Sequence, residues 1–191
     1  MNVAGSFDYL SVLISIVLGL AIANVLSGLA SIIAARRLID FYWPPVAWAV
    51  WLFFIAVQHW WAQWGVRHTQ HWTFFDFWLL LLTPVDLFLL SALILPQYRH
   101  GEKIDLSEWY FHNRVWFFAI ILFLPILAVA EELVRSGHMS SLVNLTFLIA
   151  FEIVALCALL LKSKAAQEWI TAQTMLLTLV YVGLLFFKLP S

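Results

Sequence analysis

Hydrophobic residues occur in six long runs separated by short polar segments, and each run is long enough to form one membrane-spanning helix. At a rise of about 1.5 Å per residue, about 20 residues cover the hydrocarbon core of a bilayer. The pattern therefore predicts an all-α integral membrane protein in which residues 1–191 form one domain, a bundle of six transmembrane helices. The predicted helices span residues 7–35, 43–64, 74–95, 106–135, 141–161 and 169–189.

Proline, glycine and acidic residues mark several of the helix ends. Pro44 lies in the first turn of the second predicted helix, where a missing backbone N–H is tolerated, and Pro96 ends the third. Asp105 and Glu108 have the three-residue spacing of a capping box, which predicts that the fourth helix begins near residue 106. Gly137 predicts the end of this helix.

The first hydrophobic run carries a small residue at every fourth position. This spacing places a groove with little side chain along one face of the helix, and in lipid such a groove lets a second helix approach closely. We therefore predict that the first helix is central and buried. The groove could also pack against a second copy in a homo-oligomer or against a partner membrane subunit. The row consists of Ser11, Ser15, Gly19, Ala23, Ser27 and Ser31.

The composition agrees with a membrane protein whose main partner is the lipid bilayer. Hydrophobic residues make up 64% of the chain and charged residues 11%, whereas soluble proteins carry roughly 25% charged residues. The chain has eleven Trp, a residue that favours the membrane–water interface. The net charge of −1 gives no case for a nucleic-acid partner. We expect no cleavable signal peptide, because the first run has no basic segment before it and is too long.

Basic residues in the short loops predict the orientation. The first, third and fifth loops hold most of them, which places these loops in the cytoplasm and both termini outside. The opening segment FDYLSVLISIVLGL is similar in character to small bacterial membrane proteins, and we predict a bacterial inner membrane with periplasmic termini. The seven basic residues in the odd loops, of ten in the chain, are Arg36, Arg37, Arg99, Lys103, Arg114, Lys162 and Lys164.

Two acidic residues, Asp86 and Glu152, lie near the middle of predicted helices. A charge there costs about 3 kcal/mol on insertion scales, and loss of water favours the neutral acids. We predict that both belong to an ion or proton pathway, with Asn24, Asn144 and Thr83 as polar neighbours. The alternative is that hydrogen bonds from the two carboxyls hold helices together, although such bonds average only about 0.6 kcal/mol in membranes.

Histidines gather on the predicted outer side, where His59, His68 and His71 are candidates for sensing external pH, because an unperturbed imidazole titrates near pH 6.5. No HExxH or comparable motif accompanies them, and we predict no metal site. Glu131 and Arg135 have the four-residue spacing of an ion pair at a helix end.

The second predicted helix is rich in tryptophan. Trp48 and Trp51 lie deep in it, where they would line a pocket for a lipid or a quinone; the preferred interpretation is that they pack against other helices or face lipid. Thr171, Thr174 and Thr178 share one face of the last helix. We interpret these threonines as packing residues.

Several chemistries have no support in the sequence. There is no glycine-rich phosphate loop, no nucleophile motif and no mid-membrane lysine, and we predict neither enzyme activity nor a cofactor. The first hypothesis is a small proton or cation channel or transporter. The second is a non-catalytic membrane subunit or sensor that packs with partner helices. The third is a lipid- or quinone-binding membrane protein.

Overall fold

The structure, a computed structural model, describes residues 3–63, 73–97 and 103–185, without the side chains of residues 3–10, 135, 136 and 185. It is helical almost throughout these ranges, and the all-α class predicted from the sequence is confirmed. Two short strands, β1 (Ile39–Asp40) and β2 (Ile104–Asp105), pair in parallel. The helices are α1 (Val3–Ala34), α2 (Trp43–Ala62), α3 (Phe74–Ile94), α4 (Leu106–Ile121), α5 (Phe123–Ser136), α6 (Leu142–Leu160) and α7 (Lys164–Leu185).

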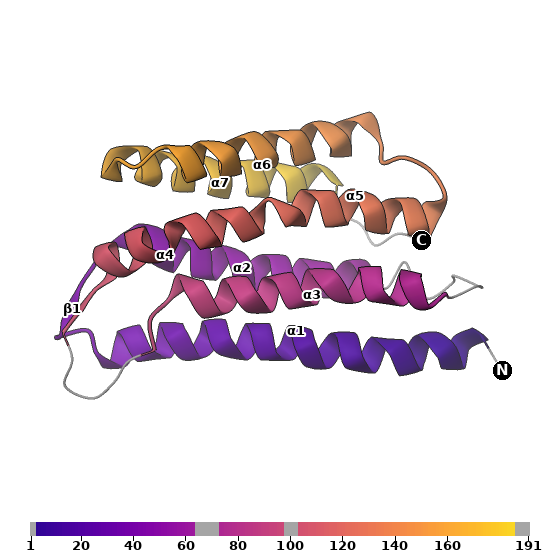
Figure 1. Ribbon diagram of the computed structural model, residues 1–191, viewed down its shortest axis with the longest axis horizontal. Helices are drawn as coiled ribbons and strands as arrows, with labels where there is room; N and C mark the ends of the chain where they lie inside the picture. The colour runs from indigo at the N-terminus through magenta and orange to yellow at the C-terminus, as the bar shows by residue number, and fades with distance from the viewer. Residues whose placement is uncertain (1–2, 64–72, 98–102, 186–191) are drawn as a thin grey trace.

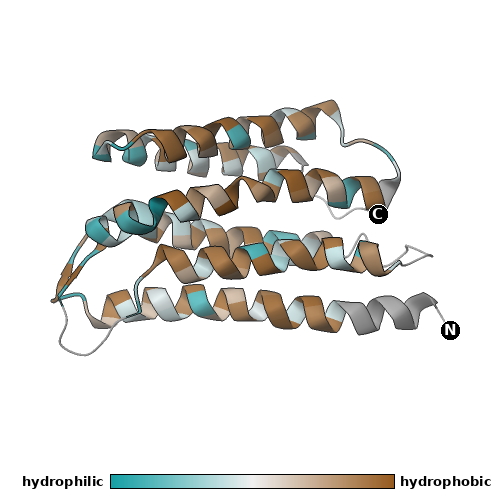
Figure 2. Cartoon of the chain, viewed as in Figure 1, coloured by the Kyte–Doolittle hydropathy of each residue, from teal (hydrophilic) through white to brown (hydrophobic). Residues whose placement is uncertain are grey.

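Five helical stretches of the described residues are long and apolar enough, by length and composition, to cross a membrane. Hydrophobic residues dominate them along their length, whereas hydrophilic residues gather at the end of the bundle near β1 (Figure 2). Helix α7 is not among the five, and it carries polar residues along one face. The five stretches are Ser11–Ala34, Trp43–Ala62, Phe74–Ile94, Leu106–Val134 and Leu142–Leu160.

Local capping explains where several helices begin and end. The Asp105 carboxylate accepts hydrogen bonds from the backbone N–H groups of Ser107 (2.7 Å) and Glu108 (3.1 Å), which confirms the predicted start near residue 106. Gly137, with φ of 69°, adopts the left-handed conformation that ends α5, as its position predicted. In α3, Thr73 and Asp76 form a reciprocal capping box.

The predicted helix 106–135 is divided into α4 and α5 at Leu122. Pro125 explains the break, because proline has no backbone N–H to donate to the carbonyl four residues earlier, that of Ile121. Helix α7 begins at Lys164, before the predicted residue 169, because the Ser163 hydroxyl accepts a hydrogen bond from the backbone N–H of Ala166 at 3.2 Å.

The helices stack in successive layers, and α1 lies at one side of the bundle (Figure 1). It packs chiefly on α3 and α2, while α6 and α7 pack together on the opposite side. The prediction that the first helix is central is therefore wrong. The central positions belong to α2, α3 and α4, which carry most of the large buried side chains.

Helix α1 buries a different face from the one with small residues. Its buried positions alternate at four- and three-residue spacing, as expected for one face of a packed helix; they are Ile14, Leu18, Ala21, Val25 and Gly28. In the predicted row, Ser15, Gly19, Ala23 and Ser27 are exposed, and Ser11 and Ser31 are half-buried. The row is thus not the main packing face within the chain, and its use by a second copy or a partner stays a prediction.

Two glycines of α1 test this assignment of faces. A Cβ at Gly28 would lie 3.0 Å from the Cβ of Leu95, whereas one at Gly19 would meet nothing within 4 Å. We expect Gly28→Ala to lower the free energy of unfolding by about 1 kcal/mol through overpacking. Gly19→Ala should leave it unchanged or raise it by up to about 1 kcal/mol, because alanine favours helix. Denaturant titration in detergent micelles measures both, and equal losses in the two variants would contradict the assignment.

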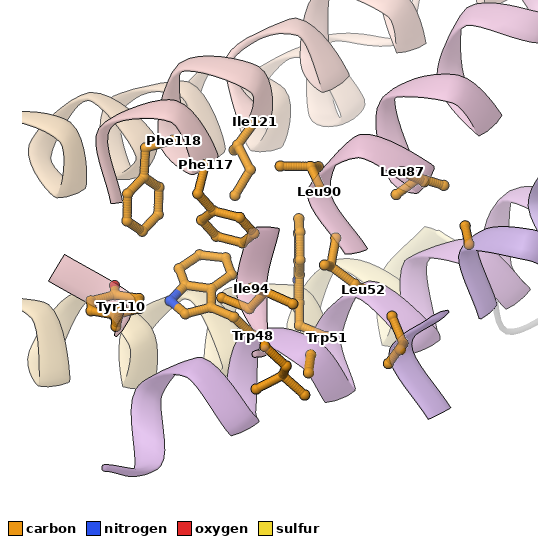
Figure 3. Close-up of a cluster of buried hydrophobic side chains, with 14 of the residues drawn as sticks. Trp48, Trp51, Leu52, Leu87, Leu90, Ile94, Tyr110, Phe117, Phe118 and Ile121 are labelled. Atoms are coloured by element: carbon orange, nitrogen blue, oxygen red, sulfur yellow. The ribbon is translucent and has the colours of Figure 1, made fainter. Parts of the chain in front are cut away.

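Aromatic side chains form the middle of the core (Figure 3). Trp48 is 1% exposed and packs edge-to-face against Trp51, Phe117 and Phe118, with ring centroids 5.2–5.6 Å apart. Its indole N–H donates to the Thr171 hydroxyl at 3.0 Å. Such bonds allow an indole to be buried, because its N–H is left with a partner.

The threonine face of α7 supplies these partners. The Trp51 indole N–H donates to the Thr178 hydroxyl at 2.8 Å, and the hydroxyls of Thr171, Thr174 and Thr178 donate to backbone carbonyls one turn earlier. All three threonines are buried, which agrees with their interpretation as packing residues.

Candidate functional site

A cavity of about 200 Å³ lies among α2, α3, α5, α6 and α7. Along α2 its lining extends from Trp48 to Gln63, about 22 Å at 1.5 Å per residue. A single water molecule needs about 10–15 Å³ of cavity volume. The cavity, at about 200 Å³, therefore has room for a small organic molecule. We call it the central cavity.

One end of the central cavity is polar. Its side chains come from the last turns of α2, α5 and α7 and the first turn of α6, which meet at the end of the bundle that carries the N-terminus of α1 (Figure 1). Thr83 of α3 lies deeper along the same wall. The residues of this polar end are Gln58, His59, Gln63, Thr83, Glu131, Glu132, Asn144 and Tyr181.

Hydrogen bonds between helices organise the polar end. The Thr83 hydroxyl donates to Oε1 of Glu131, which joins α3 to α5. The Tyr181 hydroxyl donates to Oδ1 of Asn144 at 3.0 Å, which joins α7 to α6. Two of the predicted pathway residues, Thr83 and Asn144, therefore lie in the wall of one cavity, 61 positions apart in the sequence.

His59 is a buried titratable group of the polar end. Its side chain is 9% exposed, and its Nε2 lies 3.0 Å from Nε2 of Gln63. The Oε1 atom of Gln63 is buried with no hydrogen-bond partner in the described part of the chain. A pH-sensing role for His59 stays a prediction.

The other end of the central cavity is apolar. Trp48 and Trp51 form its floor, where the two indoles are already bonded to α7, and Ile121, Leu124 and Pro125 form one side. Pro125 lies in the first turn of α5, directly after the helix break at Leu122. The sequence analysis preferred packing of Trp48 and Trp51 against other helices, and the burial of both side chains agrees with that interpretation. A ligand pocket beside them stays a prediction.

Asp86 and Glu152 do not line the central cavity. Asp86 is 8% exposed, and its Oδ2 has no hydrogen-bond partner among the described residues; Oε2 of Glu152 is likewise buried without one. Helix α3 packs mainly on α1, α2, α4 and α5, and α6 mainly on α4, α5 and α7. Asp86 on α3 and Glu152 on α6 therefore lie on helices that do not pack mainly against each other. Their role in an ion pathway stays a prediction.

Asn24 lies apart from the cavity, between α1 and α3. Its side-chain amide donates to the Ser91 hydroxyl at 3.3 Å, and its Oδ1 accepts from the Gln97 side chain at 3.3 Å. These bonds join α1 to α3 and to the residues that follow α3, an arrangement that favours a packing role.

Some of the residues predicted to be functional lie outside the described part. His68 and His71 belong to residues 64–72, and the side chain of Arg135, the predicted ion-pair partner of Glu131, is also outside it. Among the described residues, no group of three or more His, Cys, Asp or Glu side chains is placed to hold a metal ion.

The opposite end of the bundle holds a polar network that the sequence did not reveal. Arg114 is 3% exposed, and its Nη1 donates to the carbonyls of Ala158, Leu159 and Leu161 at the C-terminus of α6. A cation is favourable there because the last carbonyls of a helix lack partners. Its position in the sequence indicated a loop-facing charge.

Gln167 and two tyrosines extend this network. The Gln167 amide donates to the carbonyls of Ala158 and Leu161, and its Oε1 accepts from the Tyr110 hydroxyl at 2.7 Å. The ring of Tyr42 packs edge-to-face against Tyr110. Burial, together with the nearby Glu168, raises the pKa of Tyr42 to about 12, and this hydroxyl therefore stays protonated. We interpret the network as structural.

Sequence reasoning named His59, Thr83, Glu131 and Asn144 of the polar end but did not predict that they lie together. Glu131 was interpreted as the partner of Arg135 in an ion pair at a helix end. The informative signal was present: two consecutive acids, an asparagine and a tyrosine lie on three predicted helices, each about one or two turns from the helix end predicted to face outside. Gln58 carried no comparable signal.

Comparison of the chain with protein-family models, with curated proteins and with solved structures gives no match.

Proposed function

We propose that this chain is an integral membrane protein that binds a small amphipathic molecule in the central cavity. Its apolar body would lie against Trp48 and Trp51, and its polar head would lie among the residues of the polar end. This is the third of the sequence hypotheses, made more specific by the polar end.

The membrane assignment is supported by the surface as well as by helix length. Large hydrophobic side chains are exposed on α1, α2, α3, α4, α5, α6 and α7. Helix α7 is proposed as a sixth span, because its polar face is turned inward through Gln167 and Thr171 while Trp169 and Leu179 are exposed. With six spans both termini lie on the same side, and the basic residues of the odd loops favour a periplasmic location for them.

The observation that carries the proposal is the division of the cavity into two ends. Small-molecule sites are typically concave and mostly apolar, with a few polar groups that fix orientation. The central cavity has this composition, and its polar end lies near the helix termini. An ion route through Asp86 and Glu152 has less support, because neither carboxyl reaches the cavity.

A cavity-filling variant tests the proposal. Ala128 lines the central cavity, and Ala128→Phe should fill it, whereas Ile126 is exposed on the same helix and Ile126→Phe serves as the control. Three probes of equal chain length, octylamine, octanol and octanoate, are titrated into protein in phosphatidylcholine nanodiscs, and tryptophan fluorescence is followed. We expect saturable binding of at least one probe, weakened about tenfold or more by Ala128→Phe and unchanged by Ile126→Phe.

Binding that survives Ala128→Phe unchanged would place the probes elsewhere, and no saturable binding of any probe above empty nanodiscs would contradict the proposal. Recovery of helical circular dichroism in both variants verifies that they fold.

A further inference from the structure

The middle threonine of α7 differs from its two neighbours on the same face. The hydroxyl oxygen of Thr171 accepts the indole N–H of Trp48 at 3.0 Å. The hydroxyl oxygen of Thr178 accepts the indole N–H of Trp51 at 2.8 Å. Thr174 lies between these two threonines and is 2% exposed, but its hydroxyl oxygen accepts no hydrogen bond from the described residues. Of the three, Thr174 alone lines the central cavity.

The hydroxyl of Thr174 can only accept a further hydrogen bond. A hydroxyl has one hydrogen and two acceptor positions. The hydrogen is already used, because the group donates to the carbonyl of Ile170 at 2.9 Å and a carbonyl has no hydrogen to donate. Thr171 and Thr178 also donate to the carbonyl four residues earlier, so the three oxygens have similar orientations on the helix. A third N–H donor, placed as the two indoles are, would therefore come from the cavity.

The surroundings of Thr174 limit what else this donor can carry. Among the described residues, the apolar end offers no other side-chain donor, because both indole N–H groups are already bonded to α7. An alcohol or an amide brings acceptors of its own, and burying them there without a partner weakens binding. A ring N–H of the indole or pyrrole type brings a donor and no acceptor.

We infer that the ligand of the central cavity contains an aromatic ring N–H, and that this group donates to the hydroxyl oxygen of Thr174. This inference rests on the proposed function and specifies the apolar body of its ligand. The ring lies beside Trp48 and Trp51, which line the same part of the cavity, and pairs of aromatic rings add to the stabilisation from apolar burial. Thr174 thus selects the ligand in addition to packing α7 against α2.

Three bicyclic probes of similar size test the ring N–H. Indole carries the N–H, benzofuran has an oxygen in its place, and 1-indanol carries an alcohol. Each is dialysed to equilibrium against the protein in phosphatidylcholine nanodiscs, and uptake by empty nanodiscs is subtracted. We expect indole to bind saturably and at least about fivefold more tightly than benzofuran, because the benzofuran oxygen has no hydrogen to donate to Thr174. 1-Indanol should bind more weakly than indole, because its own oxygen finds no donor.

A substitution of nearly equal shape locates the contact. Thr174→Val removes the hydroxyl and should bring the affinities of indole and benzofuran to within about twofold of each other, whereas Thr174→Ser should keep the preference for indole. Thr146→Val is the matched control and should leave that preference unchanged. The Thr146 hydroxyl also donates to a carbonyl four residues earlier, at 2.8 Å, but this side chain is exposed on α6 and does not line the cavity.

The outcomes separate this inference from the proposed function. If an octyl probe binds and is displaced by Ala128→Phe, while indole binds no more tightly than benzofuran or does not bind, the ring N–H is overturned and the cavity stays a binding site. Binding of 1-indanol as tight as that of indole would overturn the ring class. An indole preference that survives Thr174→Val would overturn the contact with Thr174.

No saturable binding of any probe, octyl or bicyclic, would overturn both proposals. Where a variant does not fold, as judged by circular dichroism, the order of the three bicyclic probes on the unaltered protein still decides the ligand class.

Discussion

Replacing Trp48 by alanine is expected to lower the free energy of unfolding by about 4 kcal/mol. The indole is 1% exposed, and it packs edge-to-face against Trp51, Phe117 and Phe118. Its removal leaves a cavity that the rigid aromatic neighbours cannot fill, and the Thr171 hydroxyl loses the N–H that donates to it. In a membrane this packing loss persists even though apolar surface gains little from leaving lipid.

Two further variants separate the causes. Trp48→Phe keeps an aromatic ring but removes the indole N–H, and we expect about half of the alanine effect. Trp116→Ala removes a tryptophan that is 69% exposed and should cost less than about 1 kcal/mol. Denaturant titration in detergent micelles measures all three, and equal losses for Trp48 and Trp116 would contradict the description of the core.

Replacing Arg114 by methionine is expected to lower the free energy of unfolding by about 3 kcal/mol. The guanidinium donates to three carbonyls at the C-terminus of α6, and methionine fills a similar volume without donating. Gln167 continues to donate to two of these carbonyls, those of Ala158 and Leu161. The carbonyl of Leu159 loses its bond to Arg114, and the positive charge at the helix C-terminus is lost as well.

Arg36 provides a matched control. Its guanidinium donates to the carbonyl of Ile33 near the C-terminus of α1, but the side chain is exposed and the bond measures 3.3 Å. Arg36→Met should therefore cost less than about 1 kcal/mol, because water can replace the donor. Arg114→Lys keeps the positive charge but lacks the planar guanidinium group, and it should lower the free energy of unfolding by an intermediate amount. A loss for Arg36→Met that equals the loss for Arg114→Met would contradict the distinction.

The polar end of the central cavity illustrates what sequence reasoning reaches and where it stops. Thr83 and Asn144 were identified as polar neighbours of two acids in apolar runs, where charge is costly. His59 was identified because an imidazole titrates near neutral pH. Their grouping in one cavity depends on contacts between residues far apart in the chain, such as Thr83 with Glu131, 48 positions away. Asp86 and Glu152 satisfied the same sequence criterion and lie outside the cavity, because depth along a helix does not specify which neighbour a side chain faces.

The sequence by itself determined the local features of this protein: the apolar helices, the cap at Asp105, the left-handed end at Gly137 and the all-α class. These features depend on neighbouring residues, whose spacing is fixed by the chain. Only the tertiary structure decided which face each helix buries, and it placed α1 at the side of the bundle and Trp48 against Thr171, 123 positions away. The physical reason is that apolar residues cover every face of these helices, so the hydrophobic pattern cannot select a face. Shape and long-range hydrogen bonds make that selection.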